Sequence, residues 1–265
     1  MQAEPLLVTR THNVVTLALN RPQKKNSLSL ELVDILLKTL EDLAADDKVR
    51  ALVIRGAGDK AFCSGFDIRS LPTKSSENAK DKLKTLNPVE DLFQAVINFP
   101  WPVIAMINGV AFGAGCELAI CCDIRIGVAE ARMGMPPAKL GIVYPWKGLQ
   151  RFIQTVGLQT TREMFFTGRA YQGQRLQELG LLDYVISAAE IETFTVQLAE
   201  EIAANAPLAI RGTKRVLNLL LQSDAFDESS IVEAESITET AFLSEDLKEG
   251  QLAFIEKRKP VFNKN

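Results

Sequence analysis

Residues 110–127 read VAFGAGCELAICCDIRIG, and this stretch shows how the chain is organised. The apolar run VIAMI at residues 103–107 precedes it and predicts a buried strand, and DIRIGV at residues 123–128 predicts another. The segment between them predicts a loop followed by a helix, with the acid Glu117 among small apolar residues. Strand, loop, helix and strand in this order indicate an α/β arrangement with crossover connections.

The same order recurs nearer the N-terminus. VVTLAL at residues 14–19 and VRALVIR at residues 49–55 predict strands, and the helix between them has Ser29 as a suitable N-cap. From residue 190 onward the apolar spacing is helical only, which predicts helices over residues 191–204, 208–221 and 231–242. We therefore expect a mixed core over residues 1–204 and a helical region over residues 205–265.

Composition narrows the classes of function. The chain has 265 residues, 47% of them hydrophobic, and a net charge of -3, so no basic field favours nucleic acid or an anionic membrane. The N-terminus lacks the pattern of a secretory signal, and the longest apolar run is too interrupted for a membrane span. Four cysteines form no CxxC pair, and His12 is the sole histidine, so we expect no metal site and a cytoplasmic protein.

Two glycine-containing loops could bind a ligand oxygen. Gly113-Ala114-Gly115 stands at a helix start after a buried strand, and residues 63–67 (CSGFD) follow the strand of residues 49–55. A helix N-terminus leaves backbone N–H groups unpaired, and glycine allows close approach to them. One N–H from each loop could bracket a carbonyl oxygen that becomes an enolate. The alternative is that both loops are ordinary tight turns.

FCSGFDI and INGVAFGAGCELAICCDIRI resemble the two signature segments of the crotonase (enoyl-CoA hydratase/isomerase) superfamily. The resemblance extends along the chain through NRPQKKNSLS, FTGRAYQGQRLQELGLLDYVI and LKEGQLAFIEKRKPVF. It implies an α/β spiral of repeated ββα units with a C-terminal helical region that mediates trimerisation. A homotrimer or homohexamer acting on acyl-CoA substrates in fatty acid metabolism is the corresponding expectation.

The resemblance also implies a site. The two oxyanion N–H groups fall on Phe66 and Ala114, and the family's first catalytic acid matches Glu117. No cofactor is expected beyond the CoA moiety of the substrate. The residues that the resemblance assigns to CoA binding are Lys25, Ser64, Asp67, Ile68, Arg69, Phe254 and Lys257. The last two would serve a neighbouring subunit, whereas Asp67 reads as a residue that structures its loop. Residues 73–86 with Phe93 and Trp146 are candidates for the acyl pocket.

The second acid of the hydratases is replaced here by Pro137, which cannot transfer a proton. Tyr144 matches a tyrosine of the branch that resembles methylmalonyl-CoA decarboxylase, where it is thought to orient the substrate carboxylate. We therefore expect an acyl-CoA lyase that decarboxylates a malonyl-type CoA thioester. One alternative is an enoyl-CoA hydratase or double-bond isomerase with Glu117 as its single acid/base. Another, from a different class, is a non-catalytic acyl-CoA-binding protein.

Overall fold

A computed structural model describes residues 4–67, 87–222, 232, 235–237, 239–240 and 243–261. Two sheets form its core, a six-stranded one in the order β1-β2-β3-β5-β7-β10 and a four-stranded one in the order β4-β6-β8-β9. In the large sheet the β1–β2 pair is antiparallel and the remaining pairs are parallel. The strands of the large sheet are β1 Leu6–Thr11, β2 Val14–Leu19, β3 Ala51–Gly56, β5 Val103–Ile107, β7 Ile124–Val128 and β10 Tyr184–Ile186. Those of the small sheet are β4 Ala61–Cys63, β6 Val110–Phe112, β8 Arg132–Gly134 and β9 Ala170–Gln172.

The chain alternates between the two sheets. Each of β3, β5 and β7 belongs to the large sheet and is followed by a short strand of the small sheet, and helices come after β6 and β8. The predicted α/β class with repeated ββα units is confirmed. The helices are α1 Leu30–Ala44, α3 Asn87–Asn98, α4 Ala114–Ile120, α5 Trp146–Thr167, α6 Gln174–Glu178, α7 Ile191–Ala204, α8 Pro207–Gln222 and α10 Glu245–Glu256, with 3-10 turns η1 Pro22–Lys24 and η3 Pro137–Leu140.

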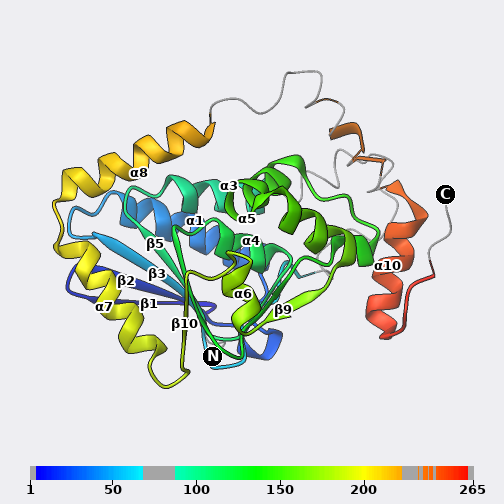
Figure 1. The fold of residues 1–265 in the computed structure, drawn as a ribbon, viewed down its shortest axis with the longest axis horizontal. Coiled ribbons are helices and arrows are strands. Elements are labelled where there is room, and N and C mark those ends of the chain that lie inside the picture. Colours follow the sequence, from blue (N-terminus) through cyan, green and yellow to red (C-terminus); the bar gives the residue numbers. More distant parts are fainter. Residues whose placement is uncertain are drawn as a thin grey trace.

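The core forms where the apolar runs predicted it. Every residue of β5 is buried, as suits a parallel strand covered on both faces. Helix α7 packs against β2, β3, β5 and β7, while α1, α3, α4 and α5 gather on the other side (Figure 1). Helix α1 begins at the expected cap, since the amide of Leu32 donates to Ser29 Oγ at 3.3 Å.

Helix α4 is brought close to the end of β4 by a glycine. A Cβ added at Gly115 would lie 2.1 Å from the carbonyl oxygen of Cys63, so a larger side chain cannot fit there. This approach places the N-terminus of α4 beside residues 63–67, the two segments that the sequence proposed as one site.

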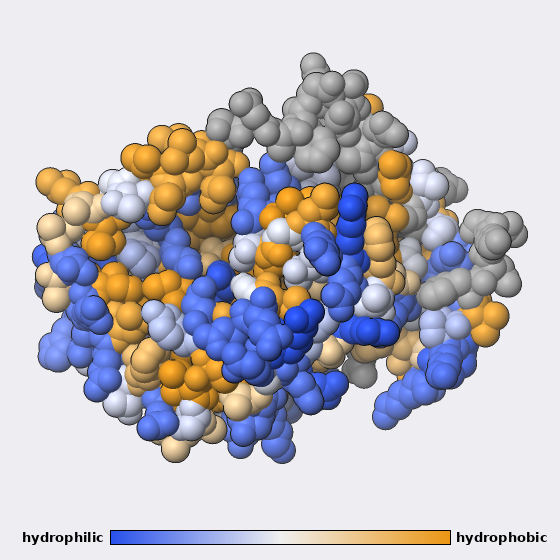
Figure 2. Space-filling model, viewed as in Figure 1, coloured by the Kyte–Doolittle hydropathy of each residue, from blue (hydrophilic) through white to orange (hydrophobic). Residues whose placement is uncertain are grey.

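Helix α8 is attached to the core by a buried lysine. Lys214 Nζ donates to Asp123 Oδ2 at 2.6 Å and to the carbonyl of Trp101 at 3.0 Å. Apolar surface gathers over α8 in Figure 2. The exposed apolar side chains of this helix are Leu208, Val216, Leu217, Leu219, Leu220 and Leu221.

Some elements differ from the sequence predictions. The sequence patterns did not predict strand β1, the short strands of the small sheet, or helices α5 and α10. Helix α5 contains a break at Gly157, where φ is 77° and ψ is 162°. Half of the residues of the helix expected over 231–242 lie outside the described residues, and those that are described are helical.

Candidate active site

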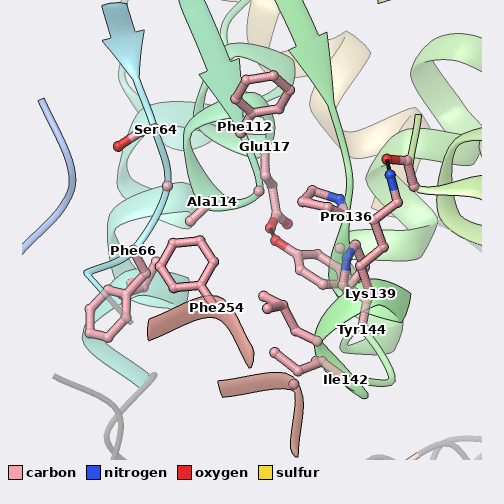
Figure 3. Close-up of a pocket in the computed structure, with 18 of the residues that line it drawn as sticks. Ser64, Phe66, Phe112, Ala114, Glu117, Pro136, Lys139, Ile142, Tyr144 and Phe254 are labelled. Atoms are coloured by element: carbon pink, nitrogen blue, oxygen red, sulfur yellow. Dashed lines mark hydrogen bonds between the residues drawn. The ribbon is translucent and has the colours of Figure 1, made fainter. Parts of the chain in front are cut away.

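A pocket with a volume of about 1380 Å³ lies between the small sheet, α3, α5 and α10. Its walls come from parts of the chain that are far apart in sequence, as Figure 3 shows. They include the loop after η1, residues 64–67, the N-terminal half of α4, the segment from Pro136 to Gly148, and α10. All of the sequence-predicted site residues that the structure describes, except Lys257, line this pocket.

The loop of residues 63–67 is fixed by a bridge to Leu28. The amide of Leu28 donates to the carbonyl of Gly65 at 2.9 Å, and the amide of Asp67 donates to the carbonyl of Leu28 at 2.9 Å. In this parallel bridge, Phe66 pairs with Leu28 but its own N–H and C=O face the opposite side. The amide of Phe66 is thereby turned away from Leu28.

The second loop meets the first directly. A Cβ added at Gly65, where φ is +106°, would lie 3.6 Å from the amide nitrogen of Ala114. Ala114 is the first residue of α4, so its N–H has no acceptor within the helix. Among the residues that the structure describes, neither the Phe66 nor the Ala114 amide donates a hydrogen bond to a protein acceptor. Two unpaired donors therefore stand on adjoining loops at the pocket wall.

Glu117 lies deeper in the same pocket, on α4, and is buried. The Tyr144 hydroxyl donates to its Oε2, and Arg151 Nη1 donates to its Oε1 at 2.7 Å. Figure 3 shows the Tyr144 ring reaching the Glu117 carboxylate from the segment below. Both carboxylate oxygens of Glu117 are thus engaged by protein donors.

Arg151 also binds a second acid. Its Nη1 donates to Glu90 Oε2 at 2.9 Å, and its Nη2 donates to Glu90 Oε1. Its guanidinium lies 5.6 Å from the centroid of the Phe93 ring, within the range of a cation–π contact. Arg151 and Glu90 were not predicted as site residues. Arg151 stands next to Phe152 in α5, a helix whose apolar side faces the core. A cation buried on that side requires an acidic partner, and this requirement is the signal that could have identified the pair.

Space for this cluster depends on Gly148. A Cβ added there would lie 2.5 Å from Tyr144 Cε1 and 2.9 Å from Glu117 Oε1. The first turn of α5 must therefore carry a glycine at this position for the tyrosine and the glutamate to meet.

Burial dominates the electrostatics of the cluster. It raises the pKa of Glu117 above its usual value, against the opposing effects of Arg151 and of the Tyr144 hydrogen bond. It also raises the pKa of Tyr144 well above its ordinary range, and the Glu117 charge adds to this shift. Burial alone would lower the pKa of Arg151, but the hydrogen bond to Glu90 and the nearby acidic groups raise it instead. Tyr144 is thus a neutral phenol and Arg151 a permanent cation at ordinary pH.

The cysteines beside the site are poor nucleophiles. Burial raises the pKa of both Cys63 and Cys116 to about 12, so their thiols stay protonated near neutral pH.

Within the described part of the chain, no group of three or more His, Cys, Asp or Glu side chains is arranged to hold a metal ion. His12 is exposed, contacts Glu200 and does not line the pocket.

Pro137, which the resemblance matches to the second acid of the hydratases, lies in an apolar part of the site. Pro137 is buried, begins η3 and lines the pocket. Phe93 and Trp146, which the sequence proposed for the acyl pocket, line it too. Residues 73–86, proposed for the same role, lie outside the described residues.

The residues expected to bind CoA divide into three groups. Lys25, Ser64 and Asp67 line the pocket near its loops, and Asp67 pairs with Arg21 at 3.8 Å, which agrees with its expected part in structuring the loop. Ile68 and Arg69 lie outside the described residues. Phe254 extends from α10 into the pocket near Phe66, as seen in Figure 3.

The structure places Phe254 and Lys257 differently with respect to this pocket, and their expected part in a neighbouring subunit's site stays a prediction. Phe254 lines the pocket of its own chain, because α10 packs directly on η3 and the turn after it. A Cβ added at Gly250 would lie 2.5 Å from the carbonyl oxygen of Leu140, which shows how close this contact is. Lys257 is the exposed left-handed cap of α10 and does not line this pocket.

None of the described helices is both long enough and apolar enough to cross a membrane.

Comparison with known proteins identifies the family. The model of the family described as enoyl-CoA hydratase/isomerase matches residues 9–265. Methylmalonyl-CoA decarboxylase of Escherichia coli is 30% identical over 256 residues, covering 96% of each chain. The short-chain-enoyl-CoA hydratase of Clostridium acetobutylicum is 31% identical over 259 residues, covering 98% of this chain and 97% of the relative.

The solved structures show the same similarity in three dimensions. A methylmalonyl-CoA decarboxylase in complex with 2-nitronate-propionyl-CoA superposes with a TM-score of 0.92 at 29% identity, with full coverage of both chains. An enoyl-CoA hydratase from Bacillus anthracis gives a TM-score of 0.78 at 31% identity, covering 99% of this chain and 100% of that one. With its two signature loops joined at one pocket, this chain belongs to the enoyl-CoA hydratase/isomerase family, the crotonase superfamily of enzymes that act on acyl-CoA.

Proposed function

We propose that the protein decarboxylates a malonyl-type acyl-CoA thioester. The bond between the α-carbon and the carboxylate breaks, CO₂ leaves, and the electron pair passes into the thioester carbonyl to form an enolate. The amides of Phe66 and Ala114 stabilise the negative oxygen of this enolate. A proton then adds to the α-carbon and gives the shortened acyl-CoA.

The unpaired amides support the enolate part of the proposal. Their N–H groups stand on adjoining loops and are not used by protein acceptors in the described structure. One donor of an oxyanion hole typically contributes about 3 kcal/mol to transition-state stabilisation. Enolate formation by loss of CO₂ needs this stabilisation but needs no base to remove a proton.

One observation carries the choice of decarboxylation. Both oxygens of Glu117 are engaged, one by Arg151 and the other by Tyr144. Pro137, which the sequence resemblance matches to the second acid of the hydratases, cannot transfer a proton. A water held between two free carboxylates has no counterpart in this arrangement. Tyr144 instead presents a hydroxyl to the pocket, suited to orient a substrate carboxylate. The greater similarity to the decarboxylase structure than to the hydratase structure, TM-score 0.92 against 0.78, supports the same choice.

Apolar walls also suit the loss of CO₂. Phe66, Val89, Phe93, Ile142 and Phe254 line the pocket together with the polar cluster. A carboxylate held among such side chains loses stabilising hydration, whereas neutral CO₂ needs no such hydration. The apolar wall therefore favours the product over the substrate carboxylate. We propose that Lys25, with Arg69 and the loop of residues 64–68, holds the CoA moiety, and that no further cofactor takes part.

The assembly and the location are part of the same proposal. The exposed apolar side chains of α8 support association of the helical region, residues 205–265, into a homotrimer or homohexamer. We propose that the enzyme acts in the cytoplasm, within acyl-CoA metabolism such as that of fatty acids.

The decisive experiment measures CO₂ release from malonyl-, methylmalonyl- and ethylmalonyl-CoA, with crotonyl-CoA hydration measured on the same preparation. We expect turnover of at least one malonyl-type thioester and slow or no hydration. Turnover of crotonyl-CoA without any CO₂ release would favour a hydratase that uses Glu117 alone. Binding of CoA thioesters by calorimetry without any product would point to a non-catalytic binding protein.

A further inference from the structure

The cluster around Glu117 contains more acid than base. Glu90 engages both terminal nitrogens of the Arg151 guanidinium, and Glu117 receives one further hydrogen bond from Nη1 at 2.7 Å. The described side chains that contact this guanidinium through ion pairs are these two carboxylates. If both acids were ionised, the cluster would carry one uncompensated negative charge beside the buried Glu117, which is costly in a medium of low dielectric constant.

A single proton removes this cost, and the geometry favours Glu117 as its place. The Glu90 side chain is 27% exposed and reaches solvent, whereas that of Glu117 is 3% exposed. Glu90 also holds Arg151 through two hydrogen bonds, the paired geometry in which an arginine and a carboxylate interact most strongly. Burial raises the pKa of Glu117, in agreement with this assignment.

We propose that Glu117 is a neutral carboxylic acid in the resting protein, and that Glu90 keeps it neutral by occupying Arg151. This inference rests on the proposed function for its catalytic meaning. In this state the contact between the Tyr144 oxygen and Glu117 Oε2, in which the tyrosine donates to an ionised carboxylate, is reversed. The protonated Oε2 donates to the Tyr144 oxygen, and the Tyr144 hydroxyl hydrogen is then free to donate to the substrate carboxylate. An ionised Glu117 would instead keep that hydrogen for itself and present a second negative charge to an anionic substrate.

The arrangement also accounts for the final proton. After CO₂ leaves, the Tyr144 hydroxyl gives its proton to the enolate carbon and takes the proton of Glu117 in return. Glu117 then regains a proton from solvent, so each turnover consumes one proton and releases one CO₂. Glu90 and Arg151 act in this scheme as positioning residues.

Other titratable groups near Glu117 do not change the net charge of the cluster formed by Glu90, Glu117 and Arg151. Cys116 and Cys121, on the same helix, are neutral thiols because burial raises the pKa of each. From the neighbouring elements come Tyr144, Arg151 and Glu90, already counted. Farther around the pocket, Lys139 donates to the carbonyl of Gly168, and Arg258 is paired with Glu249 and Glu256. Among the residues that the structure describes, the remaining charged side chains on the pocket wall are Lys24, Lys25, Asp67, Arg132, Lys147, Arg169, Glu235 and Glu239.

Infrared difference spectroscopy during a pH titration of the full-length protein tests the proposal without any need for turnover. A buried protonated carboxyl group gives a C=O stretching band separate from that of carboxylates, and Glu117→Gln assigns the band. We expect the band in the wild-type protein at neutral pH. In Glu90→Gln the freed Arg151 favours the ionised form, so the band should be lost at a pH lower by roughly one unit or more.

Asp91→Asn is the matched control. Asp91 is exposed and neighbours Glu90 on α3. Asp91→Asn changes the net charge by the same amount as Glu90→Gln, so the Glu117 band in Asp91→Asn should titrate as it does in the wild type. The alkaline limb of the pH profile of kcat/KM should move to lower pH in Glu90→Gln and remain in place in Asp91→Asn. Absence of the Glu117 band in the wild-type protein at neutral pH overturns the proposal, even if Glu90→Gln fails to fold. A band that behaves as expected in a protein without decarboxylase activity would sustain this inference and reject the proposed function.

Discussion

The pocket has two polar regions that differ in how they are satisfied. In the cluster of Glu90, Glu117, Tyr144 and Arg151, the charged and hydroxyl groups bind one another. At the loop pair of Phe66 and Ala114, by contrast, the amides have no protein acceptor in the described structure. The difference teaches that one region is set in place before a ligand arrives, while the other keeps its donors for the ligand. Both arrangements lower the reorganisation needed during a reaction.

Loss of Arg151 should disrupt the cluster of Glu90, Glu117 and Tyr144 and cause the largest loss of stability among the variants considered. Arg151→Met leaves Glu90 and Glu117 without their shared donor, and removal of one partner of a buried ion pair typically costs about 3 kcal/mol or more. We expect the free energy of unfolding from urea titration at pH 7 to fall by that amount. Arg162→Met, an exposed position on the same helix α5, is the control and should change it little. Equal stability of the two variants would show that the cluster is not a structural unit.

Loss of one amide should break the second region without disturbing the fold. Proline has no N–H, yet it is well tolerated at the first position of a helix, which Ala114 occupies. Ala114→Pro should lower kcat/KM by about 10²–10³-fold, the typical effect of losing one oxyanion donor. Ala114→Gly retains the N–H and should keep the rate within a few-fold of the wild type. If Ala114→Pro is as active as Ala114→Gly, the amide of residue 114 does not stabilise the transition state.

Tyr144 belongs to the partnered cluster and, in the proposed mechanism, also contacts the substrate, so removal of its hydroxyl tests how the two regions work together. Tyr144→Phe removes the group that contacts both Glu117 and the proposed substrate carboxylate, and we expect kcat for CO₂ release to fall about 10²-fold. CoA-thioester affinity, measured by calorimetry, should change much less. Tyr184→Phe removes an exposed hydroxyl on β10 and is the control. A change confined to KM would argue that Tyr144 only shapes the pocket.

Gly148 tests how tightly the partnered region is packed. Gly148→Ala places a methyl group 2.5 Å from the Tyr144 ring, and overpacking of this kind costs roughly 1–3 kcal/mol. The thermal midpoint should therefore fall. Gly212→Ala, on α8, meets nothing within 4 Å and should stabilise the helix slightly, by about 0.5–1 kcal/mol. Similar midpoints for the two variants would mean that Tyr144 and Glu117 are free to shift.

Local pattern was sufficient for the central strands of the large sheet and for helix α1. The apolar runs predicted β2, β3, β5 and β7, and Ser29 marked the start of α1. The short strands β4, β6 and β8 could not be predicted in the same way. Each has three residues and pairs with a strand far away in sequence, so no period of its own is visible. Helix α5 was missed partly because the break at Gly157 interrupts its periodicity.

The sequence by itself determined the family, the α/β class, the two signature loops and the presence of a proline, not an acid, at position 137, since each is carried by residues close together in the chain. Only the tertiary structure revealed that Glu117 is bound on both oxygens, that Arg151 is shared with Glu90, and that Phe254 lines the pocket of its own chain. The physical reason is separation along the chain. Glu90 and Arg151 are 61 residues apart, and a contact of that kind arises from the packing of α3, α4 and α5 rather than from any local pattern.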